Sequence, residues 1–290
     1  MSGAEVFTAH RSLLFTVAYE ILGSAVDAED VVQDAWLKWD TVDQQQVRDP
    51  RAYLVRIVSR TALDRLRTVS RRRENYVGPW LPEPLLTAPD VAEDIELAES
   101  LSIAMLVVLE TLTPTERAVF VLREVFALDY EELANALDKS PASVRQIAHR
   151  ARSHVAARRP RGELSPGQAR SAFEAFVRAV VTGDLQTLLD VLAPDVVMLG
   201  DGGGRKQALA HPVRGADKVS RLLVGGFGKF GEITFKPVDI NGRPAIVVFL
   251  EGALDSILTV EVVDGLITGV YAVRNPEKLR YIDGETPVGR

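Results

Sequence analysis

The sequence predicts a multidomain protein in which two all-α units precede one α+β unit. Apolar residues recur at helical spacing from the N-terminus to about residue 158, and alternating runs such as Ile246–Leu250 and Ile257–Val263 occur only later. Clusters of proline and glycine interrupt the pattern near 74–93 and 158–167, where we expect linkers. A chain of 290 residues is long enough for each unit to bury its own core.

Composition excludes several kinds of chemistry. The chain has no cysteine and 4 histidines, which argues against disulfides, cysteine nucleophiles and zinc clusters, so no cofactor is expected. Charges occur throughout the first thirty residues, and no later stretch reaches about 18 uncharged apolar residues. We therefore expect a cytoplasmic protein that makes no membrane contact.

The net charge of −6 conceals an alternation along the chain. Basic and acidic residues number 2 and 8 in 1–47, 9 and 2 in 48–73, 0 and 8 in 74–112, 9 and 6 in 113–162, and 14 and 16 in 163–290. The segment charges are thus −6, +7, −8, +3 and −2. An acidic average argues against a nucleic-acid partner, but two basic blocks separated by an acidic one leave that class open.

The first distinctive element is an amphipathic helix predicted from Ala28 to Trp39. Asp27 is expected to be its N-cap, with Asp30 closing an arrangement like a capping box. Its polar face carries Glu29, Asp30, Gln33, Asp34 and Lys38. That face is either a solvated surface or a docking surface.

A second, longer amphipathic helix is predicted from Pro50 to about Arg73. Its outer stripe steps at spacings of four and three through Arg56, Arg60, Asp64, Arg67 and Arg71, and the helix ends in Arg71, Arg72 and Arg73. One acid cannot neutralise this stripe. The arginines are therefore either solvated or bound to phosphate or an acidic partner.

The segment from Asp129 to Val155 predicts a helix-turn-helix. A helix over Tyr130–Leu137 and a short polar turn precede Pro141, which suits the first position of a second helix. The outward face of that helix comprises Ser143, Arg145, Gln146, His149, Arg150, Arg152 and Ser153. Arginine and glutamine there can pair with base edges in the major groove. The alternative is a buried helical hairpin, which would not need these side chains outside.

These stretches resemble one protein family. Asp27–Leu37, Arg51–Ile57 and Ala62–Arg67 are similar to domain two of bacterial RNA polymerase sigma factors of the extracytoplasmic-function branch, and Leu112–Arg117, Tyr130–Ala134 and Ser143–Arg152 to domain four. The resemblance implies an alternative sigma factor, which directs core RNA polymerase to specific promoters and is not an enzyme.

Three further motifs resemble the signatures of one subgroup, whose members carry a SnoaL-like (nuclear-transport-factor-two-like) C-terminal extension. They are Trp80, Leu81, Pro82, Glu83, Pro84 and Leu85; Asp201, Gly202, Gly203 and Gly204; and Asn275, Pro276, Glu277, Lys278 and Leu279. Arg205 stands where we expect lysine, and Glu277 where we expect aspartate. The implied domains are 1–75 (domain two), 76–100 (acidic proline-rich linker), 101–160 (domain four) and 168–290 (a cone-shaped α+β SnoaL-like domain).

The family resemblance also implies roles for individual residues. Asp30, Gln33 and Asp34 would dock on core polymerase. Minus-10 DNA would lie along Arg56, Arg60, Arg67, Arg71, Arg72 and Arg73, with a flipped base held by the loop near 40–50. Minus-35 DNA would be read by Ser143, Arg145, Gln146, His149, Arg150 and Arg152.

The C-terminal segment carries two functional alternatives. Helical patterns at 168–182 and 185–192, followed by four or more strands, suit a cone-shaped domain with a concave pocket that could take a small ligand. An isomerase or cyclase of the SnoaL type would draw on Asp201, His211, Asp255 or Tyr271, which are candidates by residue type alone. The glycines after Asp201 are equally explained by a turn with positive φ.

A regulatory interpretation accounts for the proline-rich linker. Trp80, Leu81 and Leu85 are large apolar residues in a segment that cannot form a regular core element, so they need a partner surface. We expect that surface to be the C-terminal domain, with Asn275–Leu279 in the contact. Activity would then be modulated in cis, without a separate anti-sigma factor. The remaining alternative is a ligand-responsive helix-turn-helix regulator that acts alone on DNA.

Overall fold

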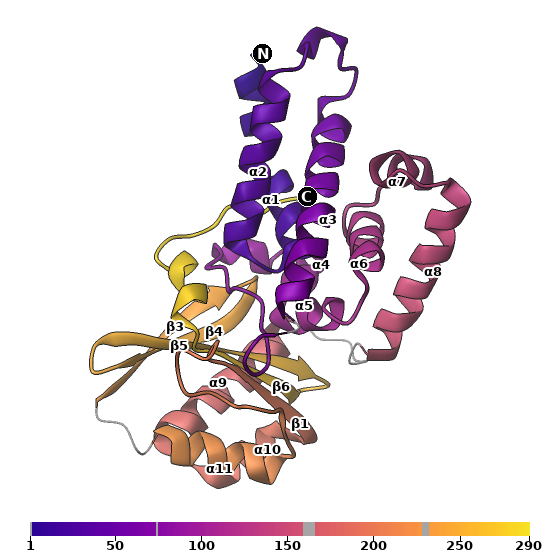
Figure 1. The fold of residues 1–290 in the computed structure, drawn as a ribbon. Coiled ribbons are helices and arrows are strands. Elements are labelled where there is room, and N and C mark those ends of the chain that lie inside the picture. Colours follow the sequence, from indigo (N-terminus) through magenta and orange to yellow (C-terminus); the bar gives the residue numbers. More distant parts are fainter. Residues whose placement is uncertain (1, 74, 159–165, 228–231) are drawn as a thin grey trace.

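The computed structural model describes residues 2–73, 75–158, 166–227 and 232–290. A six-stranded sheet lies between helices α1–α8 on one side and α9–α11 on the other (Figure 1). This arrangement confirms the predicted order of two helical units and one α+β unit. Within the described residues, no helix is long and apolar enough to cross a membrane.

The first helical unit contains α1 (Gly3–Leu22), α2 (Ala25–Asp40) and α3 (Pro50–Arg73), with a short 3-10 helix η1 (Gln44–Gln46) before α3. The predicted N-cap of α2 was wrong by one turn. Gly23 adopts a φ of 66° and ends α1, which leaves Ser24 extended so that its side chain caps α2 by accepting from the N–H of Asp27. Asp27 and Asp30 are thereby free to pair with another helix.

The second helical unit contains α4 (Ile95–Leu101), α5 (Ile103–Leu109), α6 (Pro114–Phe120), the π-helical segment η3 (Val121–Val125), α7 (Tyr130–Leu137) and α8 (Pro141–Arg158). The predicted helix-turn-helix is confirmed with its bounds. Asp129 and Glu132 form a capping box at the start of α7, and Asp138 turns the chain with a φ of 54°. A 3-10 turn η2 (Pro89–Ala92) and most of α4 lie inside the predicted 76–100 linker. We use "linker" below for 75–93.

The C-terminal domain contains α9 (Pro166–Thr182), α10 (Leu185–Val191), β1 (Leu192–Asp201), β2 (Val213–Arg214), α11 (Ala216–Phe227), β3 (Ile233–Ile240), β4 (Arg243–Leu250), β5 (Ala253–Val263) and β6 (Leu266–Val273). Two 3-10 turns follow, η4 (Pro276–Lys278) and η5 (Arg280–Ile282). The strand order is β2-β1-β6-β5-β4-β3, in which β1 pairs with β6 in parallel and the other pairs are antiparallel.

Both faces of this sheet are buried. Ile246 and Val248 of β4 face the core formed with α9–α11, whereas the alternate residues Ala245 and Val247 belong to a second core that includes Leu81 of the linker. A strand covered on both faces has an almost continuous apolar sequence. The sheet is therefore the layer that joins the C-terminal domain to the helical units.

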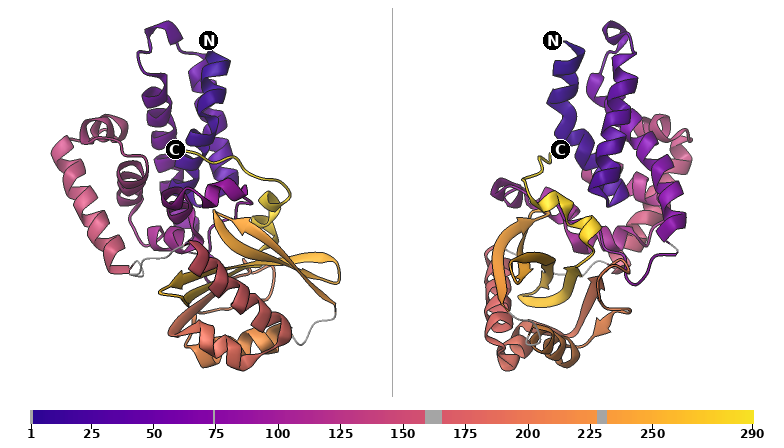
Figure 2. Two further views of the ribbon diagram at one scale, coloured as in Figure 1. Left: turned by 180° about the vertical axis from the view of Figure 1, so that it is seen from behind. Right: turned by 60° about the vertical axis from the view of Figure 1, so that its left-hand side comes forward.

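The C-terminal tail returns to the helical units. In all three views the tail leaves the sheet and ends beside the first unit (Figures 1 and 2). The N–H of Gly289 donates to Thr16 Oγ1 of α1 at 3.0 Å, and the Arg290 guanidinium pairs with Asp94 and Glu96 at the start of α4. The tail thus bridges both helical units.

A buried polar joint connects the two helical units. Arg117 of α6 is 1% exposed, its Nε donates to the carbonyl of Glu20 in α1 at 3.0 Å, and its guanidinium pairs with Glu110. The Glu20 carboxyl is also buried and accepts from Ser100 Oγ at 2.8 Å. Burial raises the pKa of Glu20 to about 8, with Ser100 and Arg117 opposing the shift.

The free energy of unfolding should therefore fall as the pH rises from about 4.5 to about 8. A carboxyl whose pKa is raised by folding contributes most below its unfolded pKa near 4.5, and the contribution is lost as pH rises toward 8. Glu20→Gln removes the titration while keeping a hydrogen-bonding amide. Between pH 5 and pH 8 the wild type should lose on the order of 3 kcal/mol of unfolding free energy more than the variant, as read from thermal unfolding by circular dichroism. An equal pH dependence of both proteins would contradict a neutral Glu20.

Candidate nucleic-acid interface and interdomain contact

The predicted docking face of α2 is solvent-exposed. Asp30, Gln33 and Asp34 all lie on the outer surface of the helix. Val26 and Leu37 continue the stripe at either end and are 39% and 59% exposed. Neither residue was among the predicted site residues, although their spacing from Asp30 and Gln33 places them on the same helix face.

One of the two predicted docking carboxylates, Asp30, has an internal partner. The Arg65 guanidinium of α3 lies 2.6 Å from Asp27 and 3.0 Å from Asp30. These pairs tie α2 to α3 at the surface. Arg65 was not among the predicted site residues because it lies off the outer arginine stripe.

The predicted DNA stripe of α3 is divided between open and covered positions. Arg56 and Arg67 are exposed, the first over the Tyr53 ring at 5.0 Å and the second paired with Asp64 at 3.0 Å. Arg60 instead contacts the second helical unit. Its Nε and Nη2 donate to the carbonyls of Ala136 and Asn135 in α7 at 2.7 and 2.8 Å. Arg71 and Arg72 lie in α3, with side chains outside the described part of the structure.

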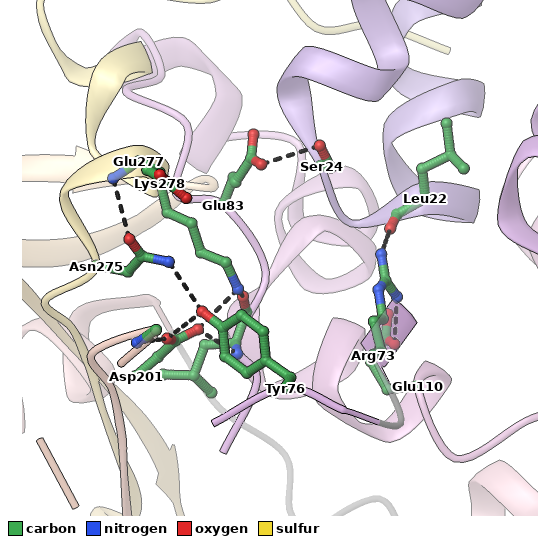
Figure 3. Close-up of polar contacts among 12 residues, drawn as sticks. Leu22, Ser24, Arg73, Tyr76, Glu83, Glu110, Asp201, Asn275, Glu277 and Lys278 are labelled. Atoms are coloured by element: carbon green, nitrogen blue, oxygen red, sulfur yellow. Dashed lines mark hydrogen bonds and ion pairs between the residues drawn. The ribbon is translucent and has the colours of Figure 1, made fainter. Parts of the chain in front are cut away.

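Arg73, another of the predicted DNA residues, has a largely buried side chain. Its guanidinium points inward, where it pairs with Glu110 and donates to the carbonyl of Leu22, both at 2.5 Å (Figure 3). It also stacks 3.7 Å from the centre of the Trp80 ring. The side chain is 15% exposed because the end of α3 is covered by α5 and the linker. Arg73 therefore joins domains in this arrangement.

A pocket of about 540 Å³ lies where the 42–56 segment meets α7. Its walls include Tyr53 and Arg56 on one side and Glu132 and Asn135 on the other. The predicted base-holding loop near 40–50 forms part of this pocket. In this arrangement α7 closes one side of it.

The outward face of α8 agrees with the predicted readout surface. Arg145, Gln146, His149, Arg150 and Arg152 are exposed, and Ser143 is partly exposed. Two of the arginines have neighbouring carboxylates at 3.4 Å, Glu116 beside Arg150 and Glu124 beside Arg152. These long, exposed ion pairs are weak and leave the side chains available to a stronger anion.

The three subgroup motifs meet around one buried carboxylate. Asp201 ends β1 and is 0% exposed. It accepts from Tyr76 Oη at 2.6 Å, the Leu81 N–H at 2.8 Å and Lys278 Nζ at 2.7 Å (Figure 3). The N–H of Gly203 adds a fourth bond at 3.0 Å. The carboxylate can be buried because every direction around it has a donor.

Trp80 lies between two cations. Arg73 of α3 is 3.7 Å and Lys278 is 4.0 Å from its ring centre. Each cation has its own carboxylate, Glu110 for Arg73 and Asp201 for Lys278. Burial lowers the pKa of Lys278 to about 8, with the Asp201 carboxylate opposing the shift. The indole ring thus connects the end of the basic helix to the C-terminal domain.

The other residues of the 80–85 motif pack against different domains. Leu81 lies in the core shared with the sheet, whereas Leu85 lies in the core of the helical units. The Glu83 carboxylate accepts from Ser24 Oγ at 2.9 Å and from the Ala25 N–H at 2.8 Å, at the start of α2. Segment 81–85 of the linker is therefore buried between the C-terminal domain and the helical units.

The two departures from the subgroup pattern compensate one another. Arg205 follows the glycine turn, Glu277 lies in the η4 turn, and their side chains form an ion pair at 2.9 Å. The turn prediction for this motif also holds, because Gly203 and Gly204 have φ values of 58° and 69°. The motif is both a turn and a contact.

The four residues considered for catalysis have separate surroundings. Asp201 is occupied by the linker, and His211 is exposed. Burial opposes ionisation of Asp255, but Arg274 and Lys206 pair with it and hold its pKa below the usual range. Burial raises the pKa of Tyr271. Within the described residues, no hydrogen bond or ion pair joins any two of the four.

Comparison with known proteins agrees with this geometry. The family model "Sigma-70 region 2" matches residues 6–72, and "Sigma-70, region 4" matches residues 102–155. The chain is 38% identical over 286 residues to the ECF RNA polymerase sigma factor SigJ of Mycobacterium tuberculosis, covering 94% of this chain and 91% of that protein. It is 32% identical over 274 residues to the probable ECF sigma factor SigI of the same species, covering 93% and 92%.

The crystal structure of Mycobacterium tuberculosis SigJ has a similar fold along the whole chain. The two structures agree with a TM-score of 0.78 at 34% sequence identity, and the match covers 95% of this chain and 97% of the other. The similarity therefore includes the C-terminal domain as well as the two helical units.

Proposed function

The chain belongs to the extracytoplasmic-function RNA polymerase sigma factors, and we propose that its C-terminal domain holds the two promoter-reading units in a closed arrangement through the linker. As an alternative sigma factor, it directs RNA polymerase to specific promoters. The observation that carries the proposal is the position of Trp80, between a cation of the basic helix and a cation of the C-terminal domain.

The polymerase-docking role is assigned to the exposed face of α2. Asp30, Gln33 and Asp34 supply charge and hydrogen bonds, while Val26 and Leu37 supply apolar area at the two ends of the stripe. Exposed apolar residues rimmed by polar ones are typical of an interaction surface. Arg65 would exchange its contact with Asp30 for one to the polymerase or to water.

The minus-10 role is assigned to Arg56, Arg60 and Arg67, together with Arg71 and Arg72. The pocket beside Tyr53 has a volume of about 540 Å³ and is large enough to take an unstacked base. However, Arg60 is bonded to α7, and α7 lines the same pocket. The second helical unit must therefore move away from α3 before DNA can use the whole stripe.

The minus-35 role is assigned to the outward face of α8. Arg145, Gln146 and His149 are free of ion pairs to protein carboxylates in the described structure, which suits contact with base edges. Arg150, Arg152 and Ser143 lie at the flanks, which suits backbone contacts. This surface can enter the major groove only when the helix-turn-helix as a whole is placed on the DNA.

We propose regulation in cis because the linker contacts both the C-terminal domain and the helical units. Its side chains fill the sheet core, its main chain bonds Asp201, and its Glu83 carboxylate completes the start of α2. The curated relatives are sigma factors, which act by binding and are not enzymes. We propose that the C-terminal domain acts here as a regulatory module, so that a separate anti-sigma factor is not needed to close the molecule.

Substitution of Trp80 by alanine should open the closed arrangement. Loss of two cation–π contacts worth about 1 kcal/mol each would shift the balance toward the open form and raise run-off transcription roughly 5- to 30-fold. The measurement uses core polymerase and a promoter selected by the protein. Trp80→Phe, which keeps a ring for both cations, is the control and should change output little. Unchanged or lowered output from Trp80→Ala would be inconsistent with a closing role.

The two DNA-facing helices should differ in their sequence dependence. Replacement of Arg145 or Gln146 by alanine should cost about 1–3 kcal/mol at the preferred minus-35 element and relax base preference there. Arg67→Ala should weaken holoenzyme binding by a similar factor on all promoters and reduce its salt dependence. Competition binding of holoenzyme to a library of minus-35 variants distinguishes the two. A uniform loss from both classes of variant would refute this assignment.

A further inference from the structure

Three hairpin turns of the C-terminal sheet have the same form, but only one is buried. Asn241-Gly242, Glu251-Gly252 and Asp264-Gly265 each have two residues with positive φ, between 51° and 80°. Such two-residue turns match the twist of the strands that they join. The second and third turns are exposed, whereas Asn241 is 0% exposed. The tip between β3 and β4 is inserted into the rest of the protein.

The Asn241 side chain bonds to three other parts of the molecule. Its Nδ2 donates to Tyr19 Oη of α1 and to the carbonyl of Leu101 at the end of α4, both at 2.8 Å. Its Oδ1 accepts from the N–H of Leu85 in the linker at 2.9 Å, and its own N–H donates to the Leu85 carbonyl at 2.9 Å. One amide therefore joins the C-terminal domain to both helical units and to the linker.

The neighbouring glycine is required by close packing as well as by φ. A Cβ atom at Gly242 would lie 2.8 Å from Cβ of Ala98 in α4 and 3.2 Å from a methyl carbon of Val91. At Gly252 and Gly265, nothing lies within 4 Å of the corresponding position. The exposed turns need glycine for their backbone conformation alone. The Asn241-Gly242 turn also needs it for contact with α4.

The hydrogen bonds of this turn continue to the polymerase-docking helix. Tyr19 Oη, which accepts from Asn241, donates to the carbonyl of Glu83 at 2.6 Å. The Glu83 carboxylate in turn bonds Ser24 and the N–H of Ala25 at the start of α2. A continuous set of buried bonds thus runs from the β3–β4 turn through Tyr19 to α2.

We propose that the Asn241-Gly242 turn is a latch by which the C-terminal domain holds the linker on the helical units. This inference rests on the proposed function and adds the element that releases the linker. The latch contains no charged group and is separate from the Trp80 contact. Partial withdrawal of the turn would leave each of its buried polar groups without a hydrogen-bond partner. The whole turn is therefore expected to dock and to withdraw in one cooperative step. Its withdrawal frees segment 83–87 from the start of α2.

Hydrogen exchange of the full-length protein tests the latch. Asn241→Gly removes the amide and keeps a residue suited to positive φ, and Asp264→Gly is the matched change at an exposed turn. The amides of Glu83 and Thr87 bond to the carbonyls of Gly23 and Asp239, so neither depends directly on the Asn241 side chain. They should exchange about tenfold or more faster in Asn241→Gly and be unchanged in Asp264→Gly. Unchanged exchange in strands β5 and β6 shows that the domain stays folded.

A second pair of variants tests the same contact sterically. Gly242→Ala and Gly265→Ala impose the same backbone strain, but only the first meets α4. Gly242→Ala should accelerate exchange at Glu83 and Thr87, and Gly265→Ala should not. Unaltered exchange in both Asn241→Gly and Gly242→Ala would overturn the latch.

Run-off transcription separates the latch from the wider proposal. Asn241→Gly should raise output in the same direction as Trp80→Ala, with Asp264→Gly at the wild-type level. Faster exchange without increased output, in a system where Trp80→Ala does raise output, overturns the latch as a regulatory element and leaves the proposed function standing. If Trp80→Ala also leaves output unchanged, the proposed function fails, and the latch fails with it.

Discussion

The relative positions of the domains depend on the buried pair of Asp201 and Lys278. Asp201 has no exposed side-chain surface and Lys278 only 7%, so the carboxylate must find all its hydrogen-bond donors within the protein. Two of those donors, the hydroxyl of Tyr76 and the N–H of Leu81, belong to the linker. The pair is therefore satisfied only with the linker in place. A single charge at the end of one strand makes linker docking specific as well as favourable.

In the proposed function, DNA and the interdomain contacts compete for one helix. Arg60 and Arg73 both lie on α3, and in the closed form their guanidiniums bond to α7 and to Glu110. The closed form thus uses part of the basic surface to hold itself together. Such a contact can regulate only if it is marginal, because a switch between two states responds to differences of a few kcal/mol. Cation–π stacking and hydrogen bonds of modest net strength suit that requirement.

Whether a candidate site could be predicted depends on how close together in the sequence the residues that form it lie. The exposed faces of α2 and α8 could be predicted because helical periodicity fixes which side chains lie opposite a buried stripe. The contact of the 80–85 motif could be predicted because Trp80, Leu81 and Leu85 are apolar residues without a local partner, whereas the motifs at 201–204 and 275–279 were identified through the family resemblance. Arg73, which the family resemblance assigned to DNA, lies against Trp80 in this structure. Periodicity identifies an outward face but not the chain segment that later covers it.

The sequence by itself determined the helices, the helix-turn-helix, the presence of strands in the C-terminal domain and the order of the domains. These follow from hydrogen bonds, caps and turns among residues a few positions apart. Only the tertiary structure decided that Asn241 would be inserted beside Tyr19 and Leu101, that Glu83 would complete the start of α2, and that Glu20 would be buried. Those contacts join residues 58 to 222 positions apart, and they exist only where several packed surfaces place a donor opposite an acceptor. No local pattern in the sequence encodes that placement, because it is a property of the assembled domains.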